Sequence, residues 1–127
     1  MTRLRRSVLA SVLTSDRPLT AYQILDRLRI EDASTAPMVV YRSLNVLIRL
    51  GLVHRVDSTK SFVACTMHEH AHPCQILVCH SCGATVEAWD ESIAGAAERL
   101  GRRFGFALDR NVIELTGICG SCQQEAS

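Results

Sequence analysis

The sequence predicts an α+β protein in which a helical first half ends in a β-hairpin and a small α/β second half follows. Two observations predict this fold class. Up to about residue 51, apolar residues recur at helical spacing, and beyond it they alternate with polar residues as in strands. In the second half, two Cys-x-x-Cys pairs, Cys79 with Cys82 and Cys119 with Cys122, each follow a strand-like stretch.

Size and charge narrow the possible functions. The 127 residues suit one ordinary domain or two very small ones. Residues 1–60 hold ten Lys/Arg and five Asp/Glu, whereas residues 61–127 hold four and eight. This distribution favours polyanion binding by the basic first half and metal binding by the acidic second half, which is rich in Cys and His. Ordinary surface charge is the simpler alternative.

The chain carries no signal for a membrane or for secretion. No apolar run approaches the roughly 18 residues of a membrane span. The opening MTRLRRSVLASVLTS has basic and apolar residues but no cleavage site of the A-x-A kind. We therefore expect a cytoplasmic protein, whose thiols stay reduced.

Two helices are predicted before residue 32. The first covers about residues 2–14, where apolar side chains recur every four positions. The second begins near Thr20, whose hydroxyl suits the N-cap position. One face of this second helix is apolar and consists of Ala21, Ile24, Leu25 and Leu28.

A third helix is predicted within residues 34–51. Ser34 or Thr35 can cap it, Pro37 fits its first turn, and Gly51 fits the position just past its end. Its inward face is formed by Val40, Leu44 and Leu47. Its outward face carries Met38, Tyr41, Arg42, Asn45 and Arg49.

The outward face of the third helix suggests DNA binding. A helix in a major groove needs Arg or Asn to reach base edges and phosphates, although most exposed Arg residues simply face solvent. Residues 52–65 then predict two strands around a turn at Asp57 to Lys60. Three helices followed by a hairpin is the order of a winged helix-turn-helix, which we assign to residues 1–64.

The second half, residues 65–127, predicts a small sheet with one helix. Residues 74–79, 84–89 and 111–119 are strand-like, and residues 91–105 form a helix. The two Cys pairs therefore lie at the ends of strands, in turns of small residues.

Four cysteines in two turns allow three interpretations. A thioredoxin-like redox pair needs one Cys-x-x-Cys at a helix N-terminus after a strand. Two facing turns instead offer four thiolates for a closed, tetrahedral structural zinc site. Structural zinc is therefore the first interpretation, a redox switch the second, and disulfides the last because the compartment is reducing.

The remaining Cys and His residues suggest a second metal site. Cys65 lies three residues before HEHAH, residues 68–72, and mixed sulfur, nitrogen and oxygen ligands suit Zn²⁺. His54 and Glu87 are more distant candidates. Alone, His54 is more simply a buried core histidine and Glu87 a surface carboxylate.

Taken together, these motifs resemble the ferric uptake regulator family over essentially the whole chain, and most of all its zinc uptake regulators. The resemblance rests on VVYRSLNVLIRLGLVHRV, SFVAC, HEHAH, VCHSCGATVE and GFALDRNVIELTGICGSC. Family members are dimeric, metal-dependent bacterial repressors with an N-terminal winged helix and a C-terminal dimerisation domain. Val39 stands where Thr is usual in the family, which removes a hydroxyl that can contact phosphate.

The resemblance implies roles for individual residues. The structural zinc ligands are Cys79, Cys82, Cys119 and Cys122. The regulatory zinc ligands are His54, Cys65, His72 and Glu87. The DNA-contacting residues are Tyr22, Tyr41 and Arg42, to which the outward helix face adds Asn45 and Arg49.

The resulting expectation is a homodimeric repressor of zinc-uptake genes that binds two zinc ions per subunit and a near-palindromic operator on double-stranded DNA. Zinc acts as corepressor, with no membrane and no small-molecule substrate involved. An iron or peroxide sensor of the same family is the nearest alternative, and Cys65 disfavours it because a thiolate prefers zinc. A zinc-stapled interaction module without DNA binding is another. No H-E-x-x-H motif or Ser/His/Asp constellation indicates an enzyme.

Overall fold

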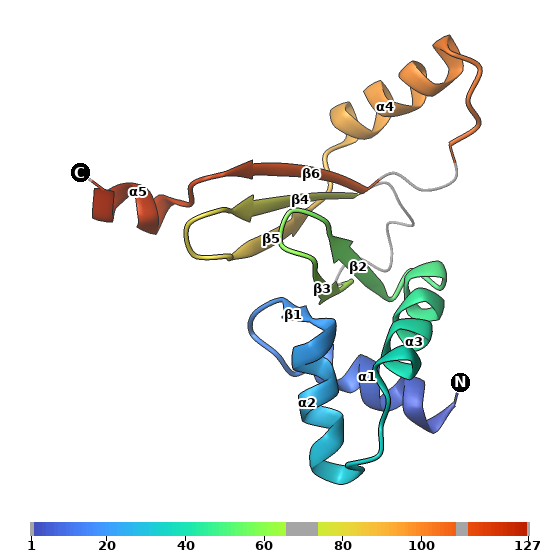
Figure 1. The fold of residues 1–127 in the computed structure, drawn as a ribbon. Helices are drawn as coiled ribbons and strands as arrows, with labels where there is room; N and C mark the ends of the chain where they lie inside the picture. Colours follow the sequence, from blue (N-terminus) through green and yellow to red (C-terminus); the bar gives the residue numbers. More distant parts are fainter. Residues whose placement is uncertain (1, 66–73, 109–111, 127) are drawn as a thin grey trace. The chain divides into compact units, whose positions relative to one another are not determined.

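The structure, a computed structural model, describes residues 2–65, 74–108 and 112–126. The chain forms two compact units, Met1–Thr66 and Met67–Ser127. Their elements follow one another along the chain as Figure 1 shows. In the described parts of the chain, no helix is both long and apolar enough to pass through a membrane.

The first unit contains the three predicted helices and the predicted hairpin. The helices are α1 (Arg3–Leu13), α2 (Ala21–Glu31) and α3 (Pro37–Arg49), and the hairpin is β2 (Val53–Val56) with β3 (Ser61–Ala64). A short strand that the sequence did not reveal, β1 (Leu19–Thr20), pairs with β3 to give an antiparallel sheet of order β1-β3-β2. The winged-helix prediction is therefore confirmed.

The core of the first unit lies between the helices and the hairpin. Both predicted inward faces, on α2 and α3, are buried. Hydrophobic burial of this kind is the main favourable term in folding. The core consists of Val8, Val12, Leu19, Ala21, Ile24, Leu25, Leu28, Val40, Leu44, Leu47, Val53 and Phe62.

Two predicted helix ends are confirmed. Thr20 caps α2 in a reciprocal capping box: its Oγ1 accepts from the Gln23 backbone N–H at 3.2 Å, and Gln23 Oε1 accepts from the Thr20 N–H at 2.9 Å. Gly51 follows α3 with φ 76°, a left-handed conformation that favours glycine. The Leu52 N–H donates to the Leu47 carbonyl at 3.0 Å, as in a Schellman motif.

The predicted cap of α3 is wrong. Its N-cap is Ala36, which makes no side-chain hydrogen bond. The hydroxyls of Ser34 and Thr35 donate instead to Asp32, at 2.6 Å to its carboxylate and 2.8 Å to its carbonyl. The turn between α2 and α3 therefore uses both hydroxyls, and Pro37 begins the helix without needing a partner for an N–H.

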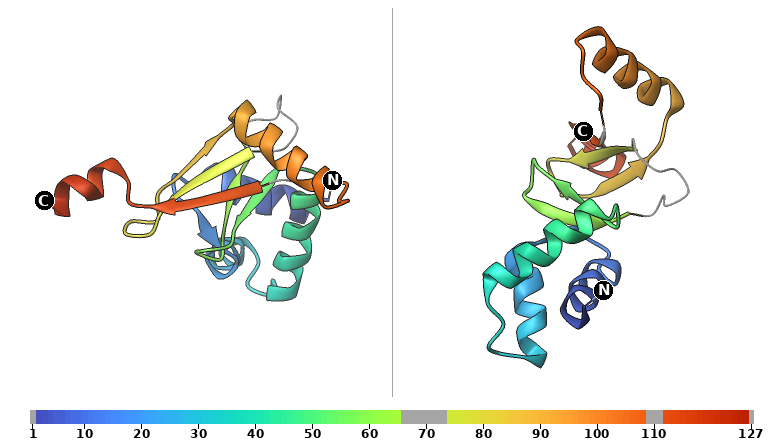
Figure 2. Two further views of the ribbon diagram at one scale, coloured as in Figure 1. Left: turned by 90° about the horizontal axis from the view of Figure 1, so that it is seen from above. Right: turned by 90° about the vertical axis from the view of Figure 1, so that its right-hand side faces the viewer.

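The described residues of the second unit form a three-stranded mixed sheet and two helices, whose ribbon Figure 2 shows in two further views. Central β4 (Cys74–Cys79) pairs antiparallel with β5 (Thr85–Ala88) and parallel with β6 (Val112–Gly117). Between β5 and β6 runs α4 (Glu91–Arg103), capped by the Asp90 carboxylate. A last helix, α5 (Gly120–Ala126), was not predicted.

Candidate metal centres and nucleic-acid interface

The four cysteines of the two pairs converge at one end of the second sheet. Parallel pairing of β4 with β6 sets Cys79 opposite Gly117, so the chain after each strand emerges at the same edge. The four Sγ atoms lie within 4.8 Å of one another, and those of Cys82 and Cys119 are 3.9 Å apart. Tetrahedral zinc with Zn–S bonds of about 2.3 Å places its sulfurs about 3.8 Å apart, whereas a disulfide needs about 2 Å. The geometry fits zinc.

Backbone hydrogen bonds hold the first cysteine turn. The Gly83 N–H donates to the Cys79 carbonyl at 2.8 Å, and Gly83 has φ 79°, which suits glycine. The His80 N–H donates to the Gly117 carbonyl at 2.9 Å and thereby links the turn to β6. Backbone hydrogen bonds therefore hold this turn and join it to β6.

Hydrogen bonds within the cluster also change the pKa values of two of its thiols. The Cys119 N–H donates to Cys79 Sγ at 3.3 Å and, together with the Cys82 N–H, lowers the pKa of the Cys79 thiol to about 6. Hydrogen bonds from the Cys122 thiol, first to Cys119 and then to Cys79, raise the pKa of Cys122 to about 12. Zn²⁺ supplies the positive charge that lets all four sulfurs be thiolates together. Sequence reasoning missed the Cys119 N–H, because backbone donors leave no mark in a residue pattern.

The second cysteine pair differs from the prediction in its local structure. It was expected in a turn at a strand end, but Cys122 lies in α5, so the pair spans the step from β6 to a helix. That setting is typical of redox pairs. The seven residues of α5 are too few for helical periodicity to show in the sequence. The convergence of both pairs, rather than their individual settings, therefore distinguishes a zinc site.

Two of the predicted regulatory ligands lie in the first unit. His54 is on β2, opposite Val63, and the Cys65 N–H extends the ladder by donating to the Leu52 carbonyl at 2.8 Å. Because Cys65 is two residues beyond Val63, it lies diagonally across from His54 on the same face. Only 3% of His54 and 4% of Cys65 are exposed, and their ligand atoms lie within 4.8 Å.

The other two predicted regulatory ligands belong to the second unit. Glu87 is on β5, opposite Ile76, and is half-buried. His72 lies outside the described residues, as do His68 and His70. Within one unit the structure thus brings together His54 and Cys65.

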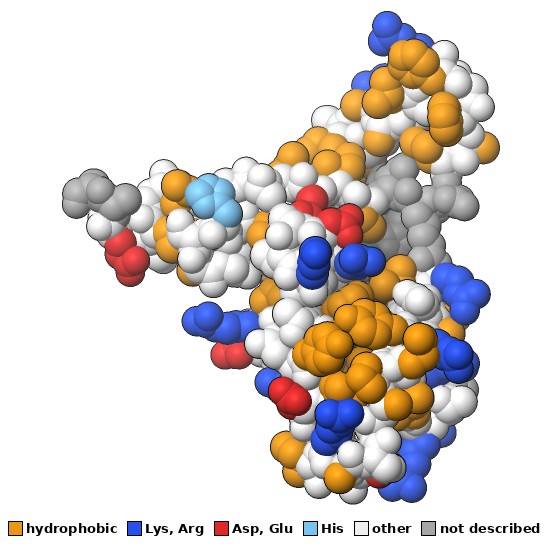
Figure 3. All heavy atoms as spheres, in the orientation of Figure 1, with side chains coloured by type: hydrophobic (Ala, Val, Ile, Leu, Met, Phe, Trp, Pro, Cys, Tyr) orange, Lys and Arg blue, Asp and Glu red, His pale blue; other side chains and the backbone are white. Residues whose placement is uncertain are grey.

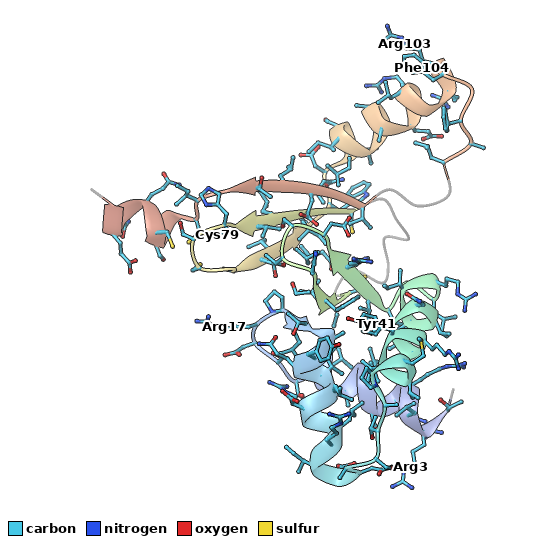
Figure 4. The ribbon with its side chains drawn as sticks, viewed as in Figure 1. Arg3, Arg17, Tyr41, Cys79, Arg103 and Phe104 are labelled. Carbon is cyan, nitrogen blue, oxygen red and sulfur yellow. The ribbon has the colours of Figure 1, made fainter. Side chains whose placement is uncertain are left out.

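The predicted outward face of α3 is exposed. Tyr41 projects from α3 with 42% of its surface accessible (Figure 4), and Tyr22, in the first turn of α2, is 62% exposed. Apolar side chains on this side of the first unit are bordered by Lys and Arg (Figure 3). The remaining members of the face are exposed as well: Met38, Arg42, Asn45 and Arg49.

Comparison with known proteins finds relatives over nearly the whole chain. The profile of the Ferric uptake regulator family matches residues 1–116. The zinc uptake regulation protein of Escherichia coli K12 is 37% identical over 123 residues, covering 96% of this chain and 72% of the relative. That of Mycobacterium tuberculosis H37Rv is 30% identical over 125 residues, covering 96% and 93%. A solved zinc uptake regulator complexed with zinc and DNA has a TM-score of 0.89 at 37% identity, covering 99% of this chain and 85% of that one. The chain belongs to the Ferric uptake regulator family.

Proposed function

We propose that this chain is a zinc-responsive, DNA-binding repressor of zinc-uptake genes, for which zinc is the corepressor. The observation that carries the proposal is the buried His54–Cys65 pair in the unit that also exposes the outward face of α3. Zinc bound by this pair can affect DNA binding, because the pair lies in the unit that binds DNA. The function is regulatory rather than catalytic, as family membership indicates.

The four-cysteine cluster holds a structural zinc ion. A closed site with four protein ligands leaves no open position for substrate. Zinc there joins the end of β4 to the start of α5 and stabilises the second unit, because binding energy of a structural zinc is folding energy.

A second, regulatory zinc binds His54 and Cys65, with His72 and Glu87 as its other ligands. Support comes from the geometry of the first two and, for the other two, from the family motif. One thiolate among imidazole and carboxylate ligands suits zinc better than ferrous iron. Because its ligands come from both units, zinc binds one arrangement of the two units more tightly than the others. If that arrangement is the one that binds DNA, the difference in zinc affinity sets how much zinc raises DNA affinity.

The DNA is bound by α3 in a major groove. Arg42 and Asn45 can reach base edges, while Tyr22, Tyr41 and Arg49 contact bases or phosphates beside them. The exposed positions of these side chains support this role.

The second unit makes the homodimer. Leu77, Val86 and Leu115 are partners in adjacent strands and form an exposed apolar row across the sheet. The outer edge of β6 has no neighbouring strand among the described residues. Leu100 near the end of α4 is exposed, and so is its C-cap residue Phe104. The Arg103 guanidinium carbon lies 5.5 Å from the centre of the Phe104 ring, and Figure 4 labels both residues. A second copy would cover these surfaces, and its two-fold symmetry would match a near-palindromic operator on cytoplasmic DNA.

Fluorescence anisotropy on an operator from a zinc-uptake promoter tests the function. Free zinc is buffered across a range, ferrous iron is run in parallel, and a scrambled duplex is the control. We expect specific binding that appears as zinc rises. Binding driven by iron instead would move the chain to the iron-sensing branch. No specific binding under either metal would leave the zinc-stapled interaction module as the better account.

A further inference from the structure

One residue of the hairpin adopts a backbone conformation that its side chain disfavours. Lys60 ends the turn between β2 and β3 with φ 52°, and it is the one non-glycine residue with positive φ in the described parts of the chain. Its N–H donates to the Asp57 carbonyl at 3.4 Å. Left-handed backbone suits glycine, because the Cβ atom of any other residue crowds the following carbonyl oxygen. Asparagine is tolerated there because its short polar side chain can form local hydrogen bonds. An unfavourable residue at such a position points to a role for its side chain.

The side chain of Lys60 supplies the unbalanced charge of the hairpin turn. Arg55 Nε lies 3.2 Å from Asp57 Oδ1, so these two charges compensate each other. Lys60 is exposed, and no described residue of its own unit forms an ion pair with it. Its ammonium group is therefore available to an external anion.

The neighbours of Lys60 indicate which anion. Ser61, the next residue, pairs with Thr20, the N-cap of α2. Tyr22 follows two residues later and is exposed. The pairing of β1 with β3 thus places Lys60 beside the N-terminus of α2, whose own dipole favours negative charge. This extends the face that carries Tyr22 towards the hairpin turn.

We propose that Lys60 binds a phosphate of the DNA backbone next to the part of the duplex contacted from the start of α2. The proposal rests on the proposed DNA-binding function. Lysine presents a compact point charge that suits a phosphate, without the planar fork that reads bases. Lys60 therefore anchors the duplex and sets affinity, whereas sequence discrimination comes from α3. Glycine or asparagine at this position would fit the backbone better but would remove the cation.

Three variants at this position separate charge from backbone conformation. Lys60→Gly and Lys60→Asn remove the charge and suit the left-handed backbone, whereas Lys60→Arg keeps both the charge and the unfavourable conformation. We measure operator affinity by anisotropy at saturating zinc, from about 50 to about 200 mM salt. Thermal unfolding is followed on the same samples. Arg99→Gln, on the exposed surface of α4, controls for the loss of one cation elsewhere.

We expect Lys60→Gly and Lys60→Asn to bind roughly fivefold more weakly per subunit at about 0.15 M salt, equally on operator and scrambled duplexes. The slope of log affinity against log salt should fall by about one per subunit. Their Tm should equal or exceed that of the unaltered protein, because the conformational penalty is relieved. Lys60→Arg and Arg99→Gln should keep the original affinity and slope.

Two results would overturn the proposal. Unchanged affinity and salt slope in the glycine and asparagine variants would mean that Lys60 does not touch DNA. A lowered Tm in both, with weaker binding, would assign Lys60 a structural role instead. If the unaltered protein itself fails to bind its operator, the DNA-binding function fails as well, so the two failures are distinguishable.

Discussion

At the scale of single residues, the four-cysteine cluster depends on backbone groups as much as on thiols. The Cys119 N–H holds the pKa of Cys79 near 6, while hydrogen bonding to Cys119 and Cys79 keeps the proton on Cys122. The two Cys-x-x-Cys pairs were enough to predict which four cysteines come together. They could not predict which sulfur would be the stronger acid, because that follows from the register of β4 against β6.

These two pKa values predict how zinc binding depends on pH. Zinc must displace the Cys122 proton at any pH below about 12, but the Cys79 proton only below about 6, where that thiol is protonated. The number of protons released per zinc should thus increase by about one as pH falls through about 6. Affinity should decline correspondingly more steeply there. A competition titration against a chelator, from about pH 5 to about pH 8, measures the slope. A constant slope across that range would contradict the low pKa of Cys79.

At the scale of elements, the helix ends show what sequence patterns can and cannot predict. Thr20 was correctly predicted as the N-cap of α2, and the structure adds the reciprocal bond with Gln23. The same reasoning failed at α3, because the hydroxyls of Ser34 and Thr35 bond to Asp32 instead. Two elements, β1 and α5, escaped prediction since strands of two residues and helices of seven are too short for periodicity to show.

The two threonines offer a matched test of the observed caps. Thr20→Ala removes the hydroxyl that accepts from the Gln23 N–H at the start of α2. This change should lower the free energy of unfolding by about 1 kcal/mol. Thr35→Ala removes a hydroxyl from an exposed turn and should change it by less than about 0.5 kcal/mol. Chemical denaturation of the zinc-loaded proteins provides the comparison. Equal losses in the two variants would contradict the capping assigned here.

At the scale of the whole molecule, the sequence predicted a basic DNA-binding part and an acidic metal-binding part, and the structure has two units. It did not predict that β6 would lie parallel to β4, since periodicity identifies strands but not their order. That order brings the two Cys pairs together and leaves the apolar row of Leu77, Val86 and Leu115 exposed. The proposed homodimer rests on these tertiary features.

A charge placed in the apolar row should prevent dimerisation. Leu115→Lys would bury an unpaired ammonium group in the interface. The free-energy cost of removing this charge from water should exceed the free energy gained by dimerisation. We expect monomers in sedimentation velocity, with structural zinc retained and operator affinity reduced because two half-sites no longer bind together. Leu13→Lys, at an exposed leucine of α1, is the control and should remain dimeric. A dimeric Leu115→Lys protein would place the interface elsewhere.

We propose that a second zinc ion, bound by Cys65, controls DNA binding. The most direct measurement combines native mass spectrometry with operator affinity for Cys65→Ser at saturating zinc. We predict a folded protein with one zinc per subunit and an affinity about 10³-fold lower, near that for nonspecific DNA. The unaltered protein should hold two zinc ions per subunit and bind tightly. Full affinity in Cys65→Ser with one zinc per subunit would show that the second zinc ion does not control DNA binding.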